Sequence, residues 1–282
     1  MALSAFTPQV SDWFARAFAA PTPAQAQAWP AISTGDHTLI SAPTGSGKTL
    51  AAFLWALDRL VAEPSADRTR LVYVSPLKAL SYDVEKNLRA PLRGIAGPGD
   101  VKVAIRTGDT PQRDRRDMLR HPPDVLITTP ESLYLMLTSQ AREIFSETEW
   151  VIVDEIHVVA QTKRGAHLAV TLERLAEQAG RDVQRIGLSA TQNPLEEVGR
   201  FMVGPHRKCT IVDTGVRKPL DLKIHVPVES MVEPDEPRDG ELDPFSGQEA
   251  TRKSIWPAIY PELLKLVREH RSTLVFLSLI HI

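Results

Sequence analysis

The sequence has a single cysteine, no secretory-leader pattern in its first ten residues and no apolar run long enough to cross a bilayer. Cys209 alone cannot form an internal disulfide, and the eight histidines show neither a Cys/His cluster nor the HExxH spacing of zinc sites. Residues 1–10 lack a basic region followed by an apolar one, and the longest apolar run, residues 50–57, is far shorter than a membrane-spanning helix. We therefore expect a cytoplasmic protein with no membrane partner.

The chain also lacks an excess of charge of either sign. Its formal net charge is −2, so a nucleic-acid partner must be held by a local basic surface rather than by the overall charge. With 43% hydrophobic and 24% charged residues, the composition is typical of a globular protein and excludes wholesale disorder, collagen-like repeats and a heptad rod. At 282 residues the chain exceeds a typical domain of about 100–200 residues, which predicts one large domain or one domain with an additional piece.

Short β-branched runs alternate with amphipathic segments between about residues 37 and 213. This alternation predicts an α/β chain, with a parallel sheet covered by helices on both faces. Residues 164–180 have the spacing of an amphipathic helix, with leucines on one face and a glycine at the end. The expected strands are residues 37–41, 70–75, 101–105, 124–128, 150–154 and 185–189.

The composition changes in the last quarter of the chain. Proline, glycine and acidic residues predict a mobile acidic loop over about residues 227–250. A helical pattern over residues 257–271 and a strand-like run over residues 272–277 follow. We therefore expect a first domain, a connector and the truncated start of a second α/β unit, over residues 1–215, 216–271 and 272–282 respectively.

A glycine-rich loop follows the first expected strand. The run Ala42-Pro-Thr-Gly-Ser-Gly-Lys-Thr49 lies between that strand and a helical run, the context that a phosphate-binding loop requires. The glycines let backbone N–H groups face phosphates, Lys48 can reach the β- and γ-phosphate oxygens, and Thr49 can ligate Mg²⁺. Because Ala42 replaces the usual first glycine, an ordinary Gly/Ser turn is the alternative. The predicted ATP-binding residues of the loop are Thr44, Gly45, Ser46, Gly47, Lys48 and Thr49.

Two carboxylates follow another apolar strand. Asp154 and Glu155 stand where the run Val151-Ile-Val ends, and open α/β sheets bind ligands at that edge. We expect both to face the crevice that holds Lys48, which makes these three the candidate catalytic residues. Asp154 would hold Mg²⁺ together with Thr49, and Glu155 would orient and deprotonate the water that attacks the γ-phosphate. The alternative for the isolated pair is a solvent-exposed Asp-Glu turn.

Two further polar elements flank these motifs. Thr22 can cap a helix, which would turn the amide of Gln25 forward to offer a donor and an acceptor to an adenine edge. Ser189 and Thr191 close another buried strand, and their hydroxyls could hydrogen-bond to the turn that carries the two carboxylates. Taken alone, the glutamine could equally be a surface residue, and the Ser-Ala-Thr tripeptide is uninformative.

The motifs occur in the order and approximate spacing of superfamily 2 helicases, and the chain resembles the large helicase-related (Lhr) group within them. The likeness runs from about Trp13 to Phe276, and its group-like stretches are residues 73–80, 128–133, 162–168 and 186–191. The resemblance implies a RecA-like P-loop NTPase fold. It also implies the first motor domain of an ATP-driven DNA repair enzyme that moves along a single nucleic-acid strand, with DNA favoured over RNA.

The resemblance further implies a path for that strand and a coupling element. Small hydroxyls, backbone amides and a lysine can grip phosphates without reading bases, as a translocating motor requires. His157 would sense the γ-phosphate and, near Ser189 and Thr191, pass the signal to the second motor domain. The residues that would line the path are Pro76, Lys78, Ala79, Thr107, Gly108, Thr129, Pro130 and Ser132.

Arginines gather beside this path. They could add positive potential near the strand, or they could form a solvent-exposed helical face that aspartates at 109, 114 and 117 partly balance. Both interpretations stay open from the sequence. The arginines are Arg106, Arg113, Arg115, Arg116 and Arg120.

The chain departs from the group near its end. Superfamily 2 motors bind ATP between two RecA-like domains, and the motifs of the second domain are absent here. Residues 277–282 do not resemble the group, which we expect to reflect a truncated or misjoined reading frame. Since an arginine finger is worth roughly 10³–10⁵ in rate, the chain alone should bind nucleotide but hydrolyse it very slowly.

One alternative function follows from that departure. The chain could be a non-catalytic module or switch that binds ATP and nucleic acid but completes no cycle. A P-loop kinase or a transporter ATPase would need an acceptor-site lid or an LSGGQ-like signature, and the sequence has neither.

Overall fold

The chain divides into two compact units, Met1–Arg217 and Lys218–Ile282. Within the second unit lies one described helix, α10 (Trp256–Glu269), which lies close to the predicted span. The predicted acidic loop and residues 277–282 lie outside the described residues. The computed structural model describes residues 3–64, 68–96, 101–190, 194–215, 221–224 and 256–276.

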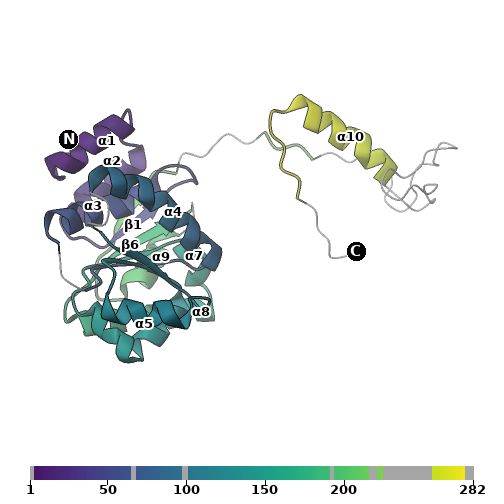
Figure 1. Cartoon of the computed structure of the whole chain (residues 1–282). Coiled ribbons are helices and arrows are strands. Elements are labelled where there is room, and N and C mark those ends of the chain that lie inside the picture. The colour runs from purple at the N-terminus through teal and green to yellow at the C-terminus, as the bar shows by residue number, and fades with distance from the viewer. Residues whose placement is uncertain are drawn as a thin grey trace. The chain divides into compact units, whose positions relative to one another are not determined.

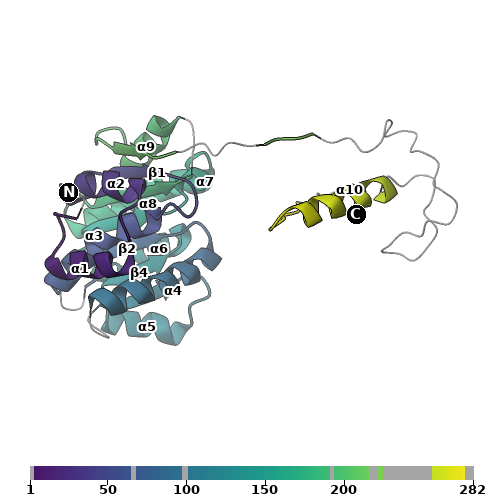
Figure 2. The same cartoon turned by 90° about the horizontal axis from the view of Figure 1, so that it is seen from above.

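A seven-stranded parallel sheet forms the centre of the first unit, with helices on both faces as predicted (Figures 1 and 2). Its strands are β1 (Thr38–Ser41), β2 (Leu71–Val74), β3 (Val103–Arg106), β4 (Val125–Thr128), β5 (Trp150–Val153), β6 (Gln184–Ser189) and β7 (Thr210–Asp213). They lie in the order β3-β4-β2-β5-β6-β1-β7, and all neighbours are parallel. The strands β1, β2, β4, β5 and β6 are buried along their whole length, which explains the near-continuous apolar runs of β2, β4 and β5.

Six strands match their predicted spans within two residues, while two elements differ. The strand β7 was not predicted; it is a four-residue edge strand with two consecutive apolar residues, Ile211 and Val212. The predicted strand over residues 272–277 is wrong for 272–276, which form no strand. A strand needs a neighbour to pair its backbone groups, and no described strand pairs with this segment.

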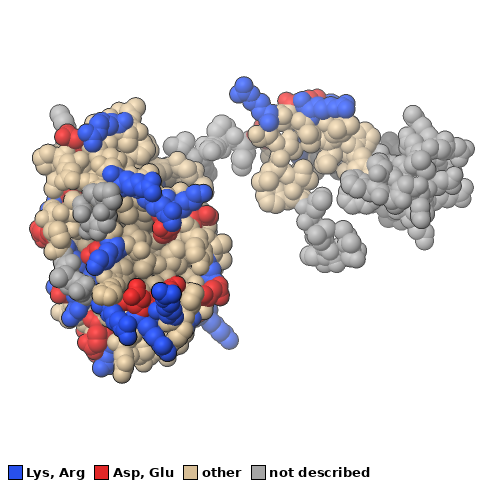
Figure 3. All heavy atoms as spheres, in the orientation of Figure 1, with Lys and Arg blue, Asp and Glu red and all other residues tan. Residues whose placement is uncertain are grey.

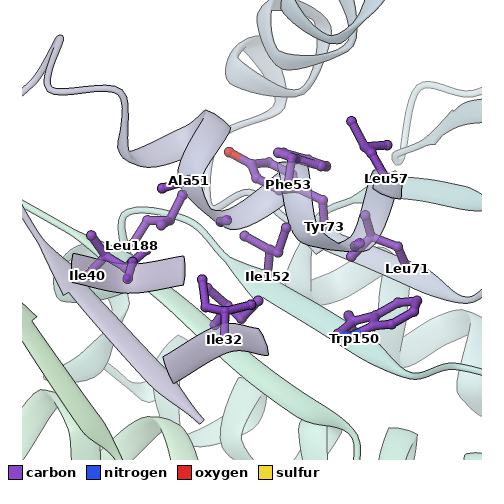
Figure 4. Close-up of a cluster of buried hydrophobic side chains, with 14 of the residues drawn as sticks. Ile32, Ile40, Ala51, Phe53, Leu57, Leu71, Tyr73, Trp150, Ile152 and Leu188 are labelled. Atoms are coloured by element: carbon purple, nitrogen blue, oxygen red, sulfur yellow. The ribbon is translucent and has the colours of Figure 1, made fainter. Parts of the chain in front are cut away.

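One face of the sheet is covered by three helices: α2 (Pro23–Ser33), α3 (Lys48–Ala62) and α4 (Lys78–Ile95). Their apolar side chains and those of the strands form one buried cluster, in which Phe53 of α3 lies over Tyr73 of β2 and Ile152 of β5 (Figure 4). Helix α1 (Pro8–Ala17) lies outside this layer, where Trp13 and Phe14 pack in a separate cluster with Trp29. These contacts fix the helix that begins at Lys48.

The opposite face is covered by α6 (Pro130–Leu137), the 3-10 helix η1 (Gln140–Phe145), α7 (Ile156–Ala160), α8 (Lys163–Ala179) and α9 (Leu195–Val203). The predicted helix over 164–180 is α8, and Gly180 ends it in the left-handed conformation. Helix α5 (Gln112–Arg120) has no buried residue. Among the described helices, none is long and apolar enough to cross a membrane.

Candidate functional site

A pocket of about 520 Å³ lies at the carboxyl edge of the sheet, between the ends of β1 and β5. Because parallel strands all end at the same edge, the glycine-rich loop after β1 and the acidic turn after β5 meet there. The structure thus brings Lys48, Asp154 and Glu155 to one pocket. Ser46 belongs to the same loop but not to the lining. The other predicted residues on its wall are Gln25, Thr44, Gly45, Gly47 and Thr49.

The glycine-rich loop leads directly into α3. Gly45 and Gly47 have φ values of 80° and 79°, in the left-handed region that glycine adopts without strain. Gly47 is the N-cap of α3, and no side chain caps the helix, so its first N–H groups remain available to an anion. Lys48 is 6% exposed, and its Nζ donates to the Ala42 carbonyl at 3.4 Å. The loop therefore places an ammonium and a helix N-terminus at one wall of the pocket.

The carboxylate of Asp154 is fixed by two donors. Its Oδ1 accepts from the Glu155 backbone N–H at 2.9 Å, and its Oδ2 accepts from the Tyr73 hydroxyl. Burial, followed by the charge of Asp154, raises the pKa of Tyr73 well above its ordinary value, so the phenol stays protonated and donates. Tyr73 was not predicted as a site residue, since its strand lies far from Asp154 in the sequence.

Glu155 has an unusual backbone. It is the single non-glycine residue at positive φ in the described part of the chain, with φ 43° and ψ 42°. This left-handed conformation turns the chain sharply from β5 into α7, and Glu155 lies on the pocket lining beside Asp154. A strained residue at a pocket is typical of functional sites.

The Gln25 side chain makes two hydrogen bonds that the sequence did not predict. The Thr22 cap forms as expected, since Thr22 Oγ1 accepts from Gln25 N at 3.3 Å. The Gln25 amide, however, completes a capping box: its Oε1 accepts from Thr22 N at 2.9 Å, and its Nε2 donates to the Gly47 carbonyl at 3.4 Å. Gln25 therefore lines the pocket and also ties α2 to the glycine-rich loop.

Two of the predicted coupling residues, His157 and Ser189, lie in contact. Nδ1 of His157 lies 3.3 Å from Ser189 Oγ, 3.3 Å from Ala190 N and 3.4 Å from Glu155 Oε2. Ser189 therefore contacts the acidic turn through His157 rather than through the carboxylates, and its hydroxyl donates to the Ala190 carbonyl. Thr191 lies outside the described residues.

The predicted strand-lining residues gather at the neighbouring ends of β2, β3 and β4. Thr129 caps α6, where its Oγ1 accepts from Ser132 N at 3.4 Å and both side chains are buried. Lys78 is accessible at the start of α4, but its Nζ lies 2.9 Å from a carboxylate oxygen of Asp109, a residue the sequence analysis did not place at the site. The exposed members of the set are Lys78, Ala79 and Gly108, and the buried ones are Pro76, Thr107, Thr129, Pro130 and Ser132.

The arginines beside this edge fall into two groups. Arg115 donates to the carbonyls of Thr110 and Gly108, at 2.7 Å each, and Arg106 donates to the Thr107 carbonyl. These two arginines thus hold the loop over residues 107–110. The others, Arg113, Arg116 and Arg120, lie exposed on α5, where positive and negative side chains interleave (Figure 3).

The described residues contain no group of three or more His, Cys, Asp or Glu side chains that could enclose a metal ion. The hydroxyl of Thr49 and the carboxylate of Asp154 nevertheless lie on the same pocket. Mg²⁺ is commonly held by one or two protein oxygens together with substrate phosphates and water. The donor set therefore fits a Mg²⁺ ion that arrives with a nucleotide.

Comparisons with known proteins agree with this geometry. Residues 22–198 match the family model described as DEAD/DEAH box helicase. The chain is 51% identical to the Lhr helicase/probable uracil glycosylase of Mycolicibacterium smegmatis over 97% of its length, and 44% identical to the ATP-dependent helicase Lhr-Core of Methanothermobacter thermautotrophicus over 95%. It spans 18% of the first relative and 31% of the second.

Solved structures show the same fold. The structure of Mycobacterium smegmatis helicase Lhr bound to ssDNA and AMP-PNP superposes with a TM-score of 0.80 at 51% identity, covering 96% of this chain and 34% of that one. The DEAD-box helicase Mss116, bound to ssRNA and UDP-BeF, has a TM-score of 0.65 at 20% identity, over 75% of this chain and 44% of its own. The predicted RecA-like fold is confirmed.

Proposed function

The chain belongs to the DEAD/DEAH box helicases and, within them, to the Lhr group; from this premise we propose that it is a motor domain that binds ATP with Mg²⁺ and a single nucleic-acid strand. The observation that carries the proposal is the meeting of Lys48, Asp154 and Glu155 on one pocket. A phosphate loop and an acidic turn at one pocket edge form the common arrangement for hydrolysing a nucleoside triphosphate.

The pocket residues divide the chemistry among them. Lys48 and the uncapped N-terminus of α3 bind the phosphate oxygens, and Thr49 and Asp154 hold Mg²⁺, which neutralises charge on the phosphates when bound. Glu155 orients the attacking water and accepts its proton. Gln25 and the loop residues Thr44, Gly45, Ser46 and Gly47 complete the ATP site. His157, Ser189 and Thr191 couple the site to its surroundings.

The other half of the sheet edge takes the strand. The accessible groups Lys78, Ala79 and Gly108 contact its phosphates, and the buried members of the predicted set shape the turns beneath. DNA is the proposed partner, since the similar M. smegmatis structure is one bound to ssDNA. These contacts read no bases, as translocation requires.

The activity of the whole protein is also a proposal, because the chain spans less than a third of these relatives. We propose an ATP-dependent DNA helicase in which a second RecA-like domain completes the ATP site. The domain division proposed for this chain is residues 1–215, 216–271 and 272–282. Without the second domain, hydrolysis should be slower by roughly 10³–10⁵, the worth of an arginine finger, and strand separation should be undetectable.

The test is binding of a fluorescent ATP analogue to the 282-residue chain. Lys48→Ala should abolish binding, while Lys86→Ala, the same change at an exposed position of α4, should leave it intact. Equal binding by both variants would contradict the assignment of the pocket. Single-turnover ATP hydrolysis with and without single-stranded DNA separates a motor from the alternative, a binding module without catalysis. Slow, DNA-dependent hydrolysis supports the motor, whereas the absence of hydrolysis supports the binding module.

A further inference from the structure

We propose that Tyr73 is a positioning residue for Asp154, whose hydroxyl sets the carboxylate for Mg²⁺ binding; this inference rests on the proposed ATP site. Tyr73 stands in the middle of the sheet, in β2, and its hydroxyl donates to Asp154 Oδ2. Neither the glycine-rich loop nor the acidic turn includes it. Its role would make β2 part of the nucleotide site.

The pairing of β2 with β5 dictates this contact. Tyr73 is the parallel partner of Ile152, and the Asp154 N–H donates to the Val74 carbonyl at 2.9 Å. Asp154 therefore follows directly from a paired strand, and the tyrosine beside it points to the α3 face of the sheet (Figure 4). The long phenol bridges from that face to the carboxylate.

Packing alone does not explain the hydroxyl. The Tyr73 ring is fully buried and stacks on Phe53, with ring centroids 5.0 Å apart and an interplanar angle of 24°. A phenylalanine would fill the same volume, whereas a buried hydroxyl is destabilising unless it finds a partner. The partner that the structure gives it is the carboxylate on the pocket wall.

The two donors to Asp154 fix the plane of its carboxylate. Tyr73 holds Oδ2 and the Glu155 N–H holds Oδ1, so the side chain cannot rotate without losing a charge-assisted hydrogen bond. Each oxygen keeps a lone pair, which leaves the carboxylate able to face a metal ion or its water. Groups that orient a metal-binding carboxylate in this way commonly change metal affinity by about 10–100-fold when they are removed.

The test compares Tyr73→Phe with Tyr82→Phe, which removes the same hydroxyl from an exposed tyrosine of α4. Mn²⁺ is the probe: its affinity for the complex of the chain with AMP-PNP is measured by electron paramagnetic resonance. We expect Tyr73→Phe to weaken Mn²⁺ binding by about tenfold or more. Tyr82→Phe should leave it unchanged, and both variants should bind AMP-PNP in EDTA as the wild type does.

A double-mutant cycle makes the role of Tyr73 specific. In an Asp154→Asn background, Tyr73→Phe should have no further effect on Mn²⁺ affinity, because the hydroxyl acts through that carboxylate. Equal Mn²⁺ affinity in wild type and Tyr73→Phe would overturn the inference and leave the ATP site standing. A wild type that binds no nucleotide would instead overturn the proposed function, and the inference with it. Loss of AMP-PNP binding in EDTA by Tyr73→Phe would show a general packing role and overturn the positioning role.

Discussion

Replacing Gly47 by alanine should damage both the fold and the pocket, for two separable reasons. The φ of 79° at Gly47 is left-handed, and an alanine there costs about 1–2 kcal/mol. A Cβ at this position would also stand 2.7 Å from Nε2 of Gln25, closer than atoms can approach. The Gln25 amide must then shift and lose its hydrogen bond from Thr22 N, a loss of about 0.5–1.5 kcal/mol.

The two contributions together predict that Gly47→Ala lowers the free energy of unfolding by about 1.5–3.5 kcal/mol. Two other glycines provide matched controls, since Gly35 and Gly45 have φ values of 90° and 80° but open space around a built Cβ. Gly35→Ala and Gly45→Ala should therefore show only the backbone contribution. The free energies come from urea unfolding followed by circular dichroism.

Nucleotide affinity provides a second measurement. Gly35 lies outside the pocket lining, so Gly35→Ala should bind a fluorescent ATP analogue as the wild type does, while Gly47→Ala should bind it poorly. The reasoning would be refuted if Gly47→Ala cost no more stability than Gly35→Ala. The contact between Gln25 and the glycine-rich loop would then contribute nothing to the free energy of unfolding.

Two further predictions concern charge. Asp109→Asn should strengthen single-stranded DNA binding about two- to fivefold at low salt, because it releases Lys78 from an exposed ion pair. The control Asp114→Asn, at an exposed aspartate of α5, should have a smaller effect. In a Lys78→Ala background Asp109→Asn should have no effect, and an effect that persists there would contradict the ion pair as its source. Burial lowers the pKa of His37 below its ordinary value of 6.5, so the unfolded chain binds the proton first and stability should fall as the pH drops below 6.5. His37→Gln should flatten this decline in urea midpoints measured between pH 7 and pH 5, and an unchanged slope would contradict the assignment.

The sequence was most informative where chemistry and burial are local. Helices cover both faces of the central strands, so several of these strands have short apolar runs that can be located within two residues. The glycine-rich loop and the acidic turn each occupy a few consecutive residues, so their residues could be named. The edge strand β7, with only two consecutive apolar residues, was missed. The order of the strands, which places β2 beside β5, also has no local signal in the sequence.

Two of the contacts missed from the sequence join distant segments. Tyr73 reaches Asp154 across 81 positions and Lys78 reaches Asp109 across 31. Arg115 is a different case. The sequence left positive potential and a solvent-exposed helical face as alternatives for the arginines, whereas the Arg115 guanidinium donates to carbonyls of the adjacent loop. Composition gives the number of charges but not how many are already paired within the fold.

The left-handed backbone of Glu155 has a consequence for how this domain can vary. A glycine at that position would relieve about 1–2 kcal/mol of conformational energy, so the fold taken by itself favours another residue there. With the role proposed for Glu155, keeping a carboxylate there is a compromise between stability and activity. Descendants of the domain that no longer hydrolyse nucleotide would be free to lose Glu155 and gain robustness, while Lys48 could persist for binding alone.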